Sequence, residues 1–220
     1  MKKIFFVAIL FTTIFVGTSS LYGQLYIGGR IGGTSASITG SGLKDFQPVS
    51  KMYLNGGAVT TLSLNRRFSL QLELLYSGKG SAFEYYGDYQ NKRGTIYLSQ
   101  KLHYFAVPLV LQFKMGDRDN YFHFDAGMVY NSLIGNKFLG NITVEELNGD
   151  IFEYEMTTSF NLNKTDFGLA FGVGLVASNI TFDFRYEIGR NQIYETGVDD
   201  APNILNRAFL VNVGYRFNLL

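Results

Sequence analysis

The chain has 220 residues and a nearly balanced charge, with 19 lysine and arginine residues against 18 aspartate and glutamate residues. This balance gives no electrostatic footprint for nucleic acid, and the absence of cysteine excludes disulfides, thiolate metal sites and thiol nucleophiles. Phenylalanine and tyrosine supply 20 and 15 residues, glycine supplies 25 and tryptophan none, a composition that favours strands over helices.

The first 23 residues are typical of a cleavable signal peptide. Lys2 and Lys3 precede an apolar run over residues 4–16, and small polar residues follow at 17–20. That run is too short for a spanning helix, and no later stretch approaches the ~20 consecutive apolar residues that such a helix needs. We expect residues 1–23 to be a leader removed before Gln24, and residues 24–220 to form one domain that could enter a membrane only as a β-barrel.

Eight later segments alternate between apolar and polar residues, as strands with two different faces do. In chain order they are 25–35, 54–64, 68–77, 105–113, 122–130, 167–175, 180–188 and 208–219. The clearest is 68–77, where one face carries Phe68, Leu70, Leu72, Leu74 and Tyr76 and the other carries Ser69, Gln71, Glu73 and Ser77. Each segment is about the 9 to 11 residues that a tilted membrane strand needs.

The apolar faces carry no charged residue, which matters because an arginine or lysine facing lipid near the midplane costs about 2 to 4 kcal/mol. A soluble β-sandwich or lipocalin-like barrel also alternates, but its apolar face turns inward. Against that alternative, the polar face is rich in glycine and poor in lysine. The connections also alternate between short (65–67, 115–120, 178–179) and long (37–53, 79–96, 132–164, 190–206). We therefore predict an all-β fold: an eight-stranded antiparallel up-and-down transmembrane β-barrel with short periplasmic turns, long outer loops and periplasmic termini.

The alternation also places several charged residues on the inward face of the predicted barrel. An eight-stranded barrel is only wide enough for side chains to fill it, so these charges should meet in a hydrogen-bonded lumen network that blocks ion flow. A looser, hydrated lumen with a narrow path is the alternative. The predicted network consists of Arg30, Glu73, Asp125, Asp183, Arg185 and Glu187.

Residues suited to catalysis or binding are few. His123 falls on the inward face beside Asp125, where a structural hydrogen bond is expected, and His103 falls on the outward face in the aromatic girdle or, alternatively, in a lipid-modifying active site. The acidic residues of the long connections lack a calcium-loop spacing, so neither a metal nor a cofactor is expected. An aromatic cluster in the connection 79–96 suits contact with a protein or glycan, and packing among the loops is the alternative; it consists of Phe83, Tyr85, Tyr86 and Tyr89.

Several stretches of the chain resemble the PorT-like outer-membrane β-barrel family of Bacteroides-type bacteria, whose members share the small OmpA-like barrel. They are Gly-Gly-Arg-Ile-Gly-Gly at 28–33, Arg-Phe-Ser-Leu-Gln-Leu-Glu-Leu-Leu-Tyr-Ser-Gly-Lys-Gly at 67–80, Val-Pro-Leu at 107–109, Phe-Gly-Leu-Ala-Phe-Gly-Val-Gly at 167–174 and Arg-Tyr-Glu-Ile-Gly at 185–189. The closing residues 212–219 are similar to the C-terminal signal read by the barrel-assembly machinery, with Gly214, Phe217 and Leu219 as its main positions. The resemblance implies the fold and an outer-membrane location in a Gram-negative cell.

From fold and composition we expect a non-enzymatic structural or interaction protein that engages a partner through its outer loops or rim. Its expected contacts are outer-membrane lipid, the barrel-assembly machinery during insertion and a possible envelope protein, with no nucleic acid. A narrow channel or an uptake or secretion accessory is the first alternative, and a lipid-modifying enzyme is the second.

Overall fold

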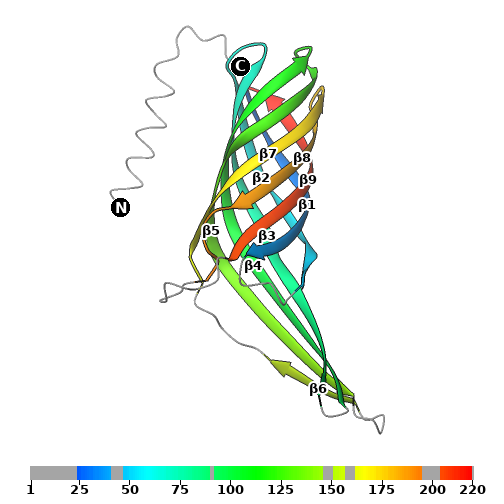
Figure 1. Ribbon diagram of the computed structural model, residues 1–220. Coiled ribbons are helices and arrows are strands. Elements are labelled where there is room, and N and C mark those ends of the chain that lie inside the picture. The colour runs from blue at the N-terminus through cyan, green and yellow to red at the C-terminus, as the bar shows by residue number, and fades with distance from the viewer. Residues whose placement is uncertain are drawn as a thin grey trace, which may run out of the picture.

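In the computed structural model the chain forms a β-barrel from which a smaller sheet projects (Figure 1). The structure describes residues 24–40, 47–89, 92–145, 151–156, 162–194 and 204–219. The proposed leader at 1–23 therefore lies outside the described residues. Within the described residues no helix has the length and apolarity needed to cross a membrane.

Nine strands are present in the described part of the chain. They are β1 (Leu25–Gly40), β2 (Gln47–Ser63), β3 (Phe68–Tyr89), β4 (Lys92–Gly116), β5 (Asn120–Glu145), β6 (Ile151–Met156), β7 (Thr165–Ala177), β8 (Ile180–Gly189) and β9 (Ile204–Asn218). Every pairing is antiparallel, and the order β4-β3-β2-β1-β9-β8-β7-β5 closes on itself through β4 and β5. The ring thus contains the eight predicted strands, while β6 pairs with β5 outside it.

The three tight connections lie at one end of the barrel, which we call the turn end; the C-terminus of β9 also lies there (Figure 1). Between β2 and β3, the Asn65 side chain accepts hydrogen bonds from the backbone amides of Arg67 and Phe68, both at 2.8 Å. Between β4 and β5, Gly116 has a φ of +134°, which a residue with a Cβ rarely adopts. These local devices hold neighbouring strands in the register that the alternation requires.

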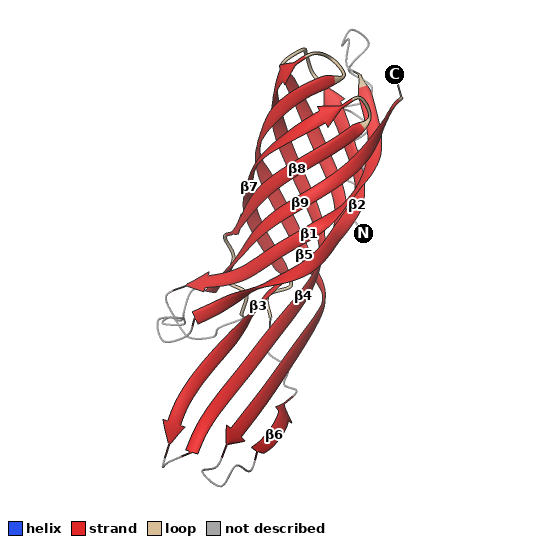
Figure 2. Cartoon of the chain, turned by 90° about the vertical axis from the view of Figure 1, so that its right-hand side faces the viewer, coloured by secondary structure: helices blue, strands red, loops and turns tan. Residues whose placement is uncertain are grey.

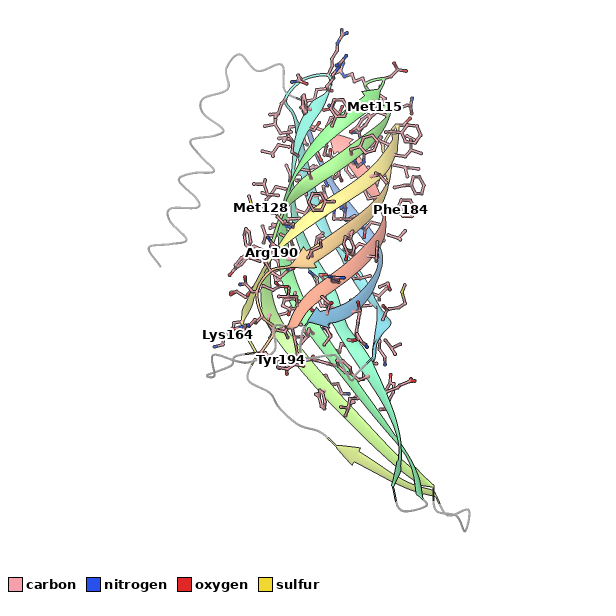
Figure 3. The ribbon with its side chains drawn as sticks, in the orientation of Figure 1. Met115, Met128, Lys164, Phe184, Arg190 and Tyr194 are labelled. Atoms are coloured by element: carbon pink, nitrogen blue, oxygen red, sulfur yellow. The ribbon has the colours of Figure 1, made fainter. Side chains whose placement is uncertain are left out.

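The predicted inward and outward frames are confirmed. Along β3 the outward Leu74 is 48% exposed while the inward Glu73 and Ser69 are fully buried. On β8, Phe184 is 57% exposed and lies on the outside of the barrel wall (Figure 3). A band of exposed apolar side chains therefore surrounds the barrel, which is the reverse of a soluble β-protein.

The prediction of long loops was wrong for three of the four long connections. Strands β3, β4 and β5 have 22, 25 and 26 residues and continue past the barrel, so most of 79–96 and much of 132–164 is strand. β1 and β2 likewise extend into 37–53. Beyond the barrel, β3, β4, β5 and β6 form a sheet that we call the projecting sheet, and we call this end of the molecule the sheet end (Figure 2).

Irregular pairings mark the border between the barrel and the projecting sheet. The register of β2 against β3 shifts between Ser50 and Asn55, and that of β4 against β5 shifts at His103. Gly80, in β3 at the same border, has a φ of +136°, and a Cβ there would lie 2.1 Å from the Gln100 carbonyl oxygen. Bulges and glycines of this kind bend strands, so β3, β4 and β5 can diverge from the barrel wall and continue as the projecting sheet.

Candidate functional site

The barrel lumen is filled by side chains that all eight barrel strands direct inward. Its central feature, which we call the charge layer, combines two arginines, three carboxylates and one histidine from β1, β3, β5 and β8. The charge layer consists of Arg30, Glu73, His123, Asp125, Asp183 and Arg185. Five of the six predicted network residues thus come together, and the sixth, Glu187, forms its ion pair with Lys79 instead.

Glu73 is the centre of the charge layer. Its Oε1 lies 3.1 Å from Arg30 Nη1 and 2.7 Å from Arg185 Nη2, and its Oε2 accepts from Nη1 of each arginine at 3.1 and 3.0 Å. Gln71 donates a further hydrogen bond to Oε1. A carboxylate held between two guanidiniums satisfies a charge that would otherwise be very costly to bury.

The remaining acidic residues bind the outer sides of the two arginines. Arg30 Nη2 donates to Asp183 Oδ2 at 2.9 Å, and Arg185 Nη2 lies 3.8 Å from Asp125 Oδ2. His123 joins these two aspartates, because its Nδ1 is 2.7 Å from Asp125 Oδ1 and its Nε2 is 3.5 Å from Asp183 Oδ1. The pairing of His123 with Asp125 matches the expected structural hydrogen bond, whereas its approach to Asp183 could not be read from the sequence.

Among the described residues, one group of three could in principle hold a metal ion. It consists of His123, Asp125 and Asp183, whose possible ligand atoms all lie within 4.8 Å of one another. Both carboxylates already face guanidiniums, and a divalent cation here would be repelled by Arg30 and Arg185. We therefore interpret the group as part of the ion network. A cavity of about 30 Å³ lies beside it, between Gln71, Gln112 and Tyr121, which is room for little more than water.

Glu187 belongs to a second ion pair nearer the sheet end. Lys79 Nζ lies 2.8 Å from Glu187 Oε2 and 3.3 Å from Asn131 Oδ1, and all three residues are buried. Lys79 was missed because the sequence assigned residue 79 to a loop. The signal was present, since Lys79 continues the inward frame of Glu73 and Ser77 at a spacing of two residues.

An apolar cluster, which we call the apolar cap, fills the lumen at the sheet end. Ile38, Leu102 and Tyr104 come from barrel strands, whereas Leu162 and Ile193 come from the segments before β7 and after β8. The two segments pair through a bridge between Leu162 and Tyr194, and Tyr194 lies at this mouth of the barrel (Figure 3). Burial raises the pKa of Tyr194, whose hydroxyl donates to Gln100 Oε1 at 2.8 Å.

The aromatic candidates for loop contact lie on a strand, which corrects their assignment to a loop. Phe83 belongs to β3 and packs against the apolar cap. Tyr85, Tyr86 and Tyr89 belong to the part of β3 that pairs with β4 in the projecting sheet. The reason for the error is that the sequence of this segment shows no clean period of two.

His103 lies on the outward face, as its frame predicts, next to the register shift of β4. Its Nδ1 hydrogen-bonds to the Tyr76 hydroxyl on the neighbouring strand. The partner is thus an aromatic side chain of the outer surface and not a serine. This geometry is typical of an interfacial pair of aromatic rings.

The three positions of the expected assembly signal lie at the end of β9. Gly214 faces the lumen, where a Cβ would come within 2.6 Å of Thr181 Oγ1, so no larger residue fits without a shift. Phe217 and Leu219 are 57% and 55% exposed on the outside. The arrangement presents an apolar outer face at the end of β9, which pairs with β1 and β8.

Comparison with known proteins gives one family. The profile described as "Outer membrane protein beta-barrel domain" matches residues 19–195. No curated relative matches the chain.

Solved structures match the chain at low sequence identity. Ail, the attachment invasion locus protein of Yersinia pestis, is 13% identical over 87% of this chain and 98% of its own, with a TM-score of 0.40. Neisserial surface protein A is 14% identical over 88% and 97%, with a TM-score of 0.38. Outer membrane protein W of E. coli is 16% identical over 89% and 98%, with a TM-score of 0.37.

Proposed function

The chain belongs to the outer membrane protein beta-barrel domain family, and from this premise we propose that it is a structural or interaction protein whose working surface is the projecting sheet. The observation that carries the proposal is the length of β3, β4 and β5. A tilted strand crosses the membrane in about 9 to 11 residues, so roughly half of each of these strands lies beyond the lipid. A barrel used only as an anchor would not need this extension.

The filled lumen supports the same proposal. The charge layer, the Lys79–Glu187 pair and the apolar cap occupy successive levels between the turn end and the sheet end. A narrow channel would need a continuous hydrated path through all three levels. Function is therefore better placed on the outer surface than in the lumen.

The edges of the projecting sheet suit a protein partner. Among the described strands, β6 pairs only with β5, and β3 beyond Glu84 pairs only with β4. Each edge presents backbone N–H and C=O groups along one side, which an extended segment of another chain can join by adding a strand. An envelope protein is the expected partner, besides outer-membrane lipid around the barrel and the barrel-assembly machinery that reads the end of β9.

We further propose that the turn end faces the periplasm and that the projecting sheet lies outside the cell, since bacterial barrels have short periplasmic turns. In this orientation both ends of the mature chain are periplasmic, residues 1–23 being the removed leader. The stretches similar to PorT-like barrels favour that branch of the family. The proposal is of a non-enzymatic protein, because the hydrogen-bond partner of His103 is the Tyr76 hydroxyl and not a serine.

The orientation can be tested cleanly because the chain has no cysteine. Lys137→Cys, exposed on β5 of the projecting sheet, should react with a membrane-impermeant maleimide on intact cells. Arg66→Cys, exposed in the turn between β2 and β3, should react only after the outer membrane is permeabilised. The reverse labelling pattern would overturn the orientation.

The interaction role needs a separate test. A photo-crosslinking residue at Lys137 should form a discrete protein adduct in living cells, whereas the same residue at Phe184, in the apolar band, should form none. A matched variant with residues 85–96 replaced by an Asn-Gly turn keeps the Glu84–Tyr97 pair that would flank the new turn. It should assemble normally but lose the adduct. Adduct formation that is equal at both sites, or that survives the shortening, would contradict the proposal.

A further inference from the structure

The turn end of the barrel contains a second cavity, which we call the vestibule. It has a volume of about 840 Å³, within the range of small-molecule sites, and is separate in composition from the charge layer. Four of its lining residues are cationic and one is acidic. The lining consists of Gln24, Tyr26, Ser63, Leu64, Asn65, Arg66, Lys114, Gly116, Asp117, Arg118, Tyr121 and Arg216.

Arg216 forms the floor of the vestibule and is buried. None of its described contacts is with a carboxylate. Its Nε and Nη2 donate to the Ser178 carbonyl oxygen at 3.3 and 3.1 Å, and its Nη1 donates to the Tyr121 hydroxyl at 2.6 Å. Its guanidinium also stacks on the Tyr26 ring, with 4.2 Å to the centroid. Every one of these partners is neutral, so the positive charge at the floor is not compensated by them.

Lys114 adds a second cation on the same aromatic ring. Its Nζ lies 5.6 Å from the Tyr121 centroid, and the Arg216 guanidinium lies 5.2 Å from it. The hydrogen bond that Lys114 Nζ donates goes to the Ser63 hydroxyl at 3.2 Å. The two like charges near this ring repel each other, and an anion within reach of both would compensate that repulsion.

The rim of the vestibule repeats this excess of positive charge. Arg66 and Arg118 line it, with Asp117 as the one lining carboxylate. Arg118 Nε donates at 2.8 Å to the Gln24 side-chain oxygen, which also accepts from the Tyr26 hydroxyl, so this arginine is held by a neutral amide. The charge layer, in contrast, surrounds its two arginines with carboxylates.

We propose that the vestibule is a binding site for a dianionic oxyanion, a phosphate or a paired carboxylate, with Lys114 and Arg216 as the inner ligands and Arg66 and Arg118 at the rim. Guanidinium and ammonium groups that keep N–H donors free recognise such oxygens. In the proposed orientation the vestibule opens to the periplasm. The ligand is then either a free ion or the acidic end group of an envelope molecule.

Titration of the folded protein in an uncharged detergent, followed by ¹⁵N NMR at constant sodium chloride, tests the proposal. Inorganic phosphate and succinate should each produce saturable shifts of the Tyr121 and Arg216 signals. Acetate, a single carboxylate, should bind at least about tenfold more weakly, because it engages fewer cations. Saturation by phosphate but not by succinate assigns the site to phosphate groups, and the opposite result assigns it to carboxylate end groups.

Lys114→Gln should weaken binding by about tenfold, since it removes one charged partner but leaves the hydrogen bond to Ser63 possible. Arg67→Gln is the matched control, because the Arg67 carbonyl accepts a hydrogen bond from the Lys114 backbone amide but Arg67 does not line the vestibule. Binding by this variant should stay within about twofold of wild type. Altered migration of the unboiled protein on a gel would show a variant that has not folded. Absence of saturable shifts in the folded wild type, or equal affinity in folded Lys114→Gln, would overturn the proposal.

Discussion

The barrel and the projecting sheet share the strands β3, β4 and β5, but their side chains follow different patterns. Inside the barrel, β3 places Glu73 at the centre of the lumen and Leu74 on the outer surface, and the alternation is strict. Beyond the barrel, β4 and β5 carry Lys101 and Lys137 directly opposite each other, both exposed. Lipid on one side and a packed lumen on the other impose a period of two, and water on both sides does not.

The largest loss of stability is expected from Glu73→Ala, which removes the hydrogen-bond acceptor shared by Arg30 and Arg185. Two buried guanidiniums would then face each other, and breaking a buried pair in this way costs about 3 to 5 kcal/mol. We expect a correspondingly lower urea concentration for the loss of the fast-migrating folded form on unboiled gels.

The control for Glu73→Ala is Lys137→Ala in the projecting sheet, which removes an exposed charge and should change stability by less than about 0.5 kcal/mol. Similar destabilisation by both substitutions would mean that the barrel and the sheet unfold as one unit and that the contrast between them is only geometric.

A smaller effect, on membrane assembly, is expected when an outward-facing leucine is replaced by arginine. The effect should differ between the barrel part of β3 and the projecting part of β5. Leu74 and Leu139 are 48% and 43% exposed, so their accessibility is nearly the same. Leu74→Arg faces lipid and should cost about 2 to 4 kcal/mol in membrane assembly, whereas Leu139→Arg faces water and should cost almost nothing. Yield of folded protein in outer-membrane fractions measures both, and equal yields would place the lipid boundary elsewhere.

A substitution at the border between the barrel and the projecting sheet should change stability only locally. Ile193→Ala removes a buried side chain of the apolar cap that comes from a connecting segment, and we expect the local opening of residues 190–194 to become easier by about 2 kcal/mol. Amide hydrogen exchange should accelerate there and at Asn163, which donates its amide to the Ile193 carbonyl. Exchange in β8 should stay unchanged; a global acceleration would show that the cap is part of the barrel's cooperative unit.

The smallest expected effect is on ion flow. Because the charge layer and the apolar cap fill the lumen at different heights, the wild-type protein should carry no steady current in a planar bilayer, and Ile193→Ala should not either, since the charge layer remains. Stable single-channel openings in the wild type that persist in Glu73→Gln would contradict a filled lumen and favour the channel alternative.

The sequence by itself determined the barrel. Alternation in segments such as 68–77 and 180–188 identified eight strands and their outward faces, because a residue placed on the wrong face would put charge into lipid. It also identified Arg30, Glu73, Asp125, Asp183 and Arg185 as inward-facing, and the structure brings these five together.

Only the tertiary structure decided how the strands end and which inward groups meet. The parts of β3 and β4 in the projecting sheet lie beyond the lipid that imposes the alternation, so no strict period of two marked them as strand. The direct ion pair of Glu187 with Lys79 depends on the stagger between β3 and β8, which are not neighbours in the ring. The same is true of the vestibule, where Lys114 and Arg216 share Tyr121 because the ring closes, a relation that no local pattern encodes.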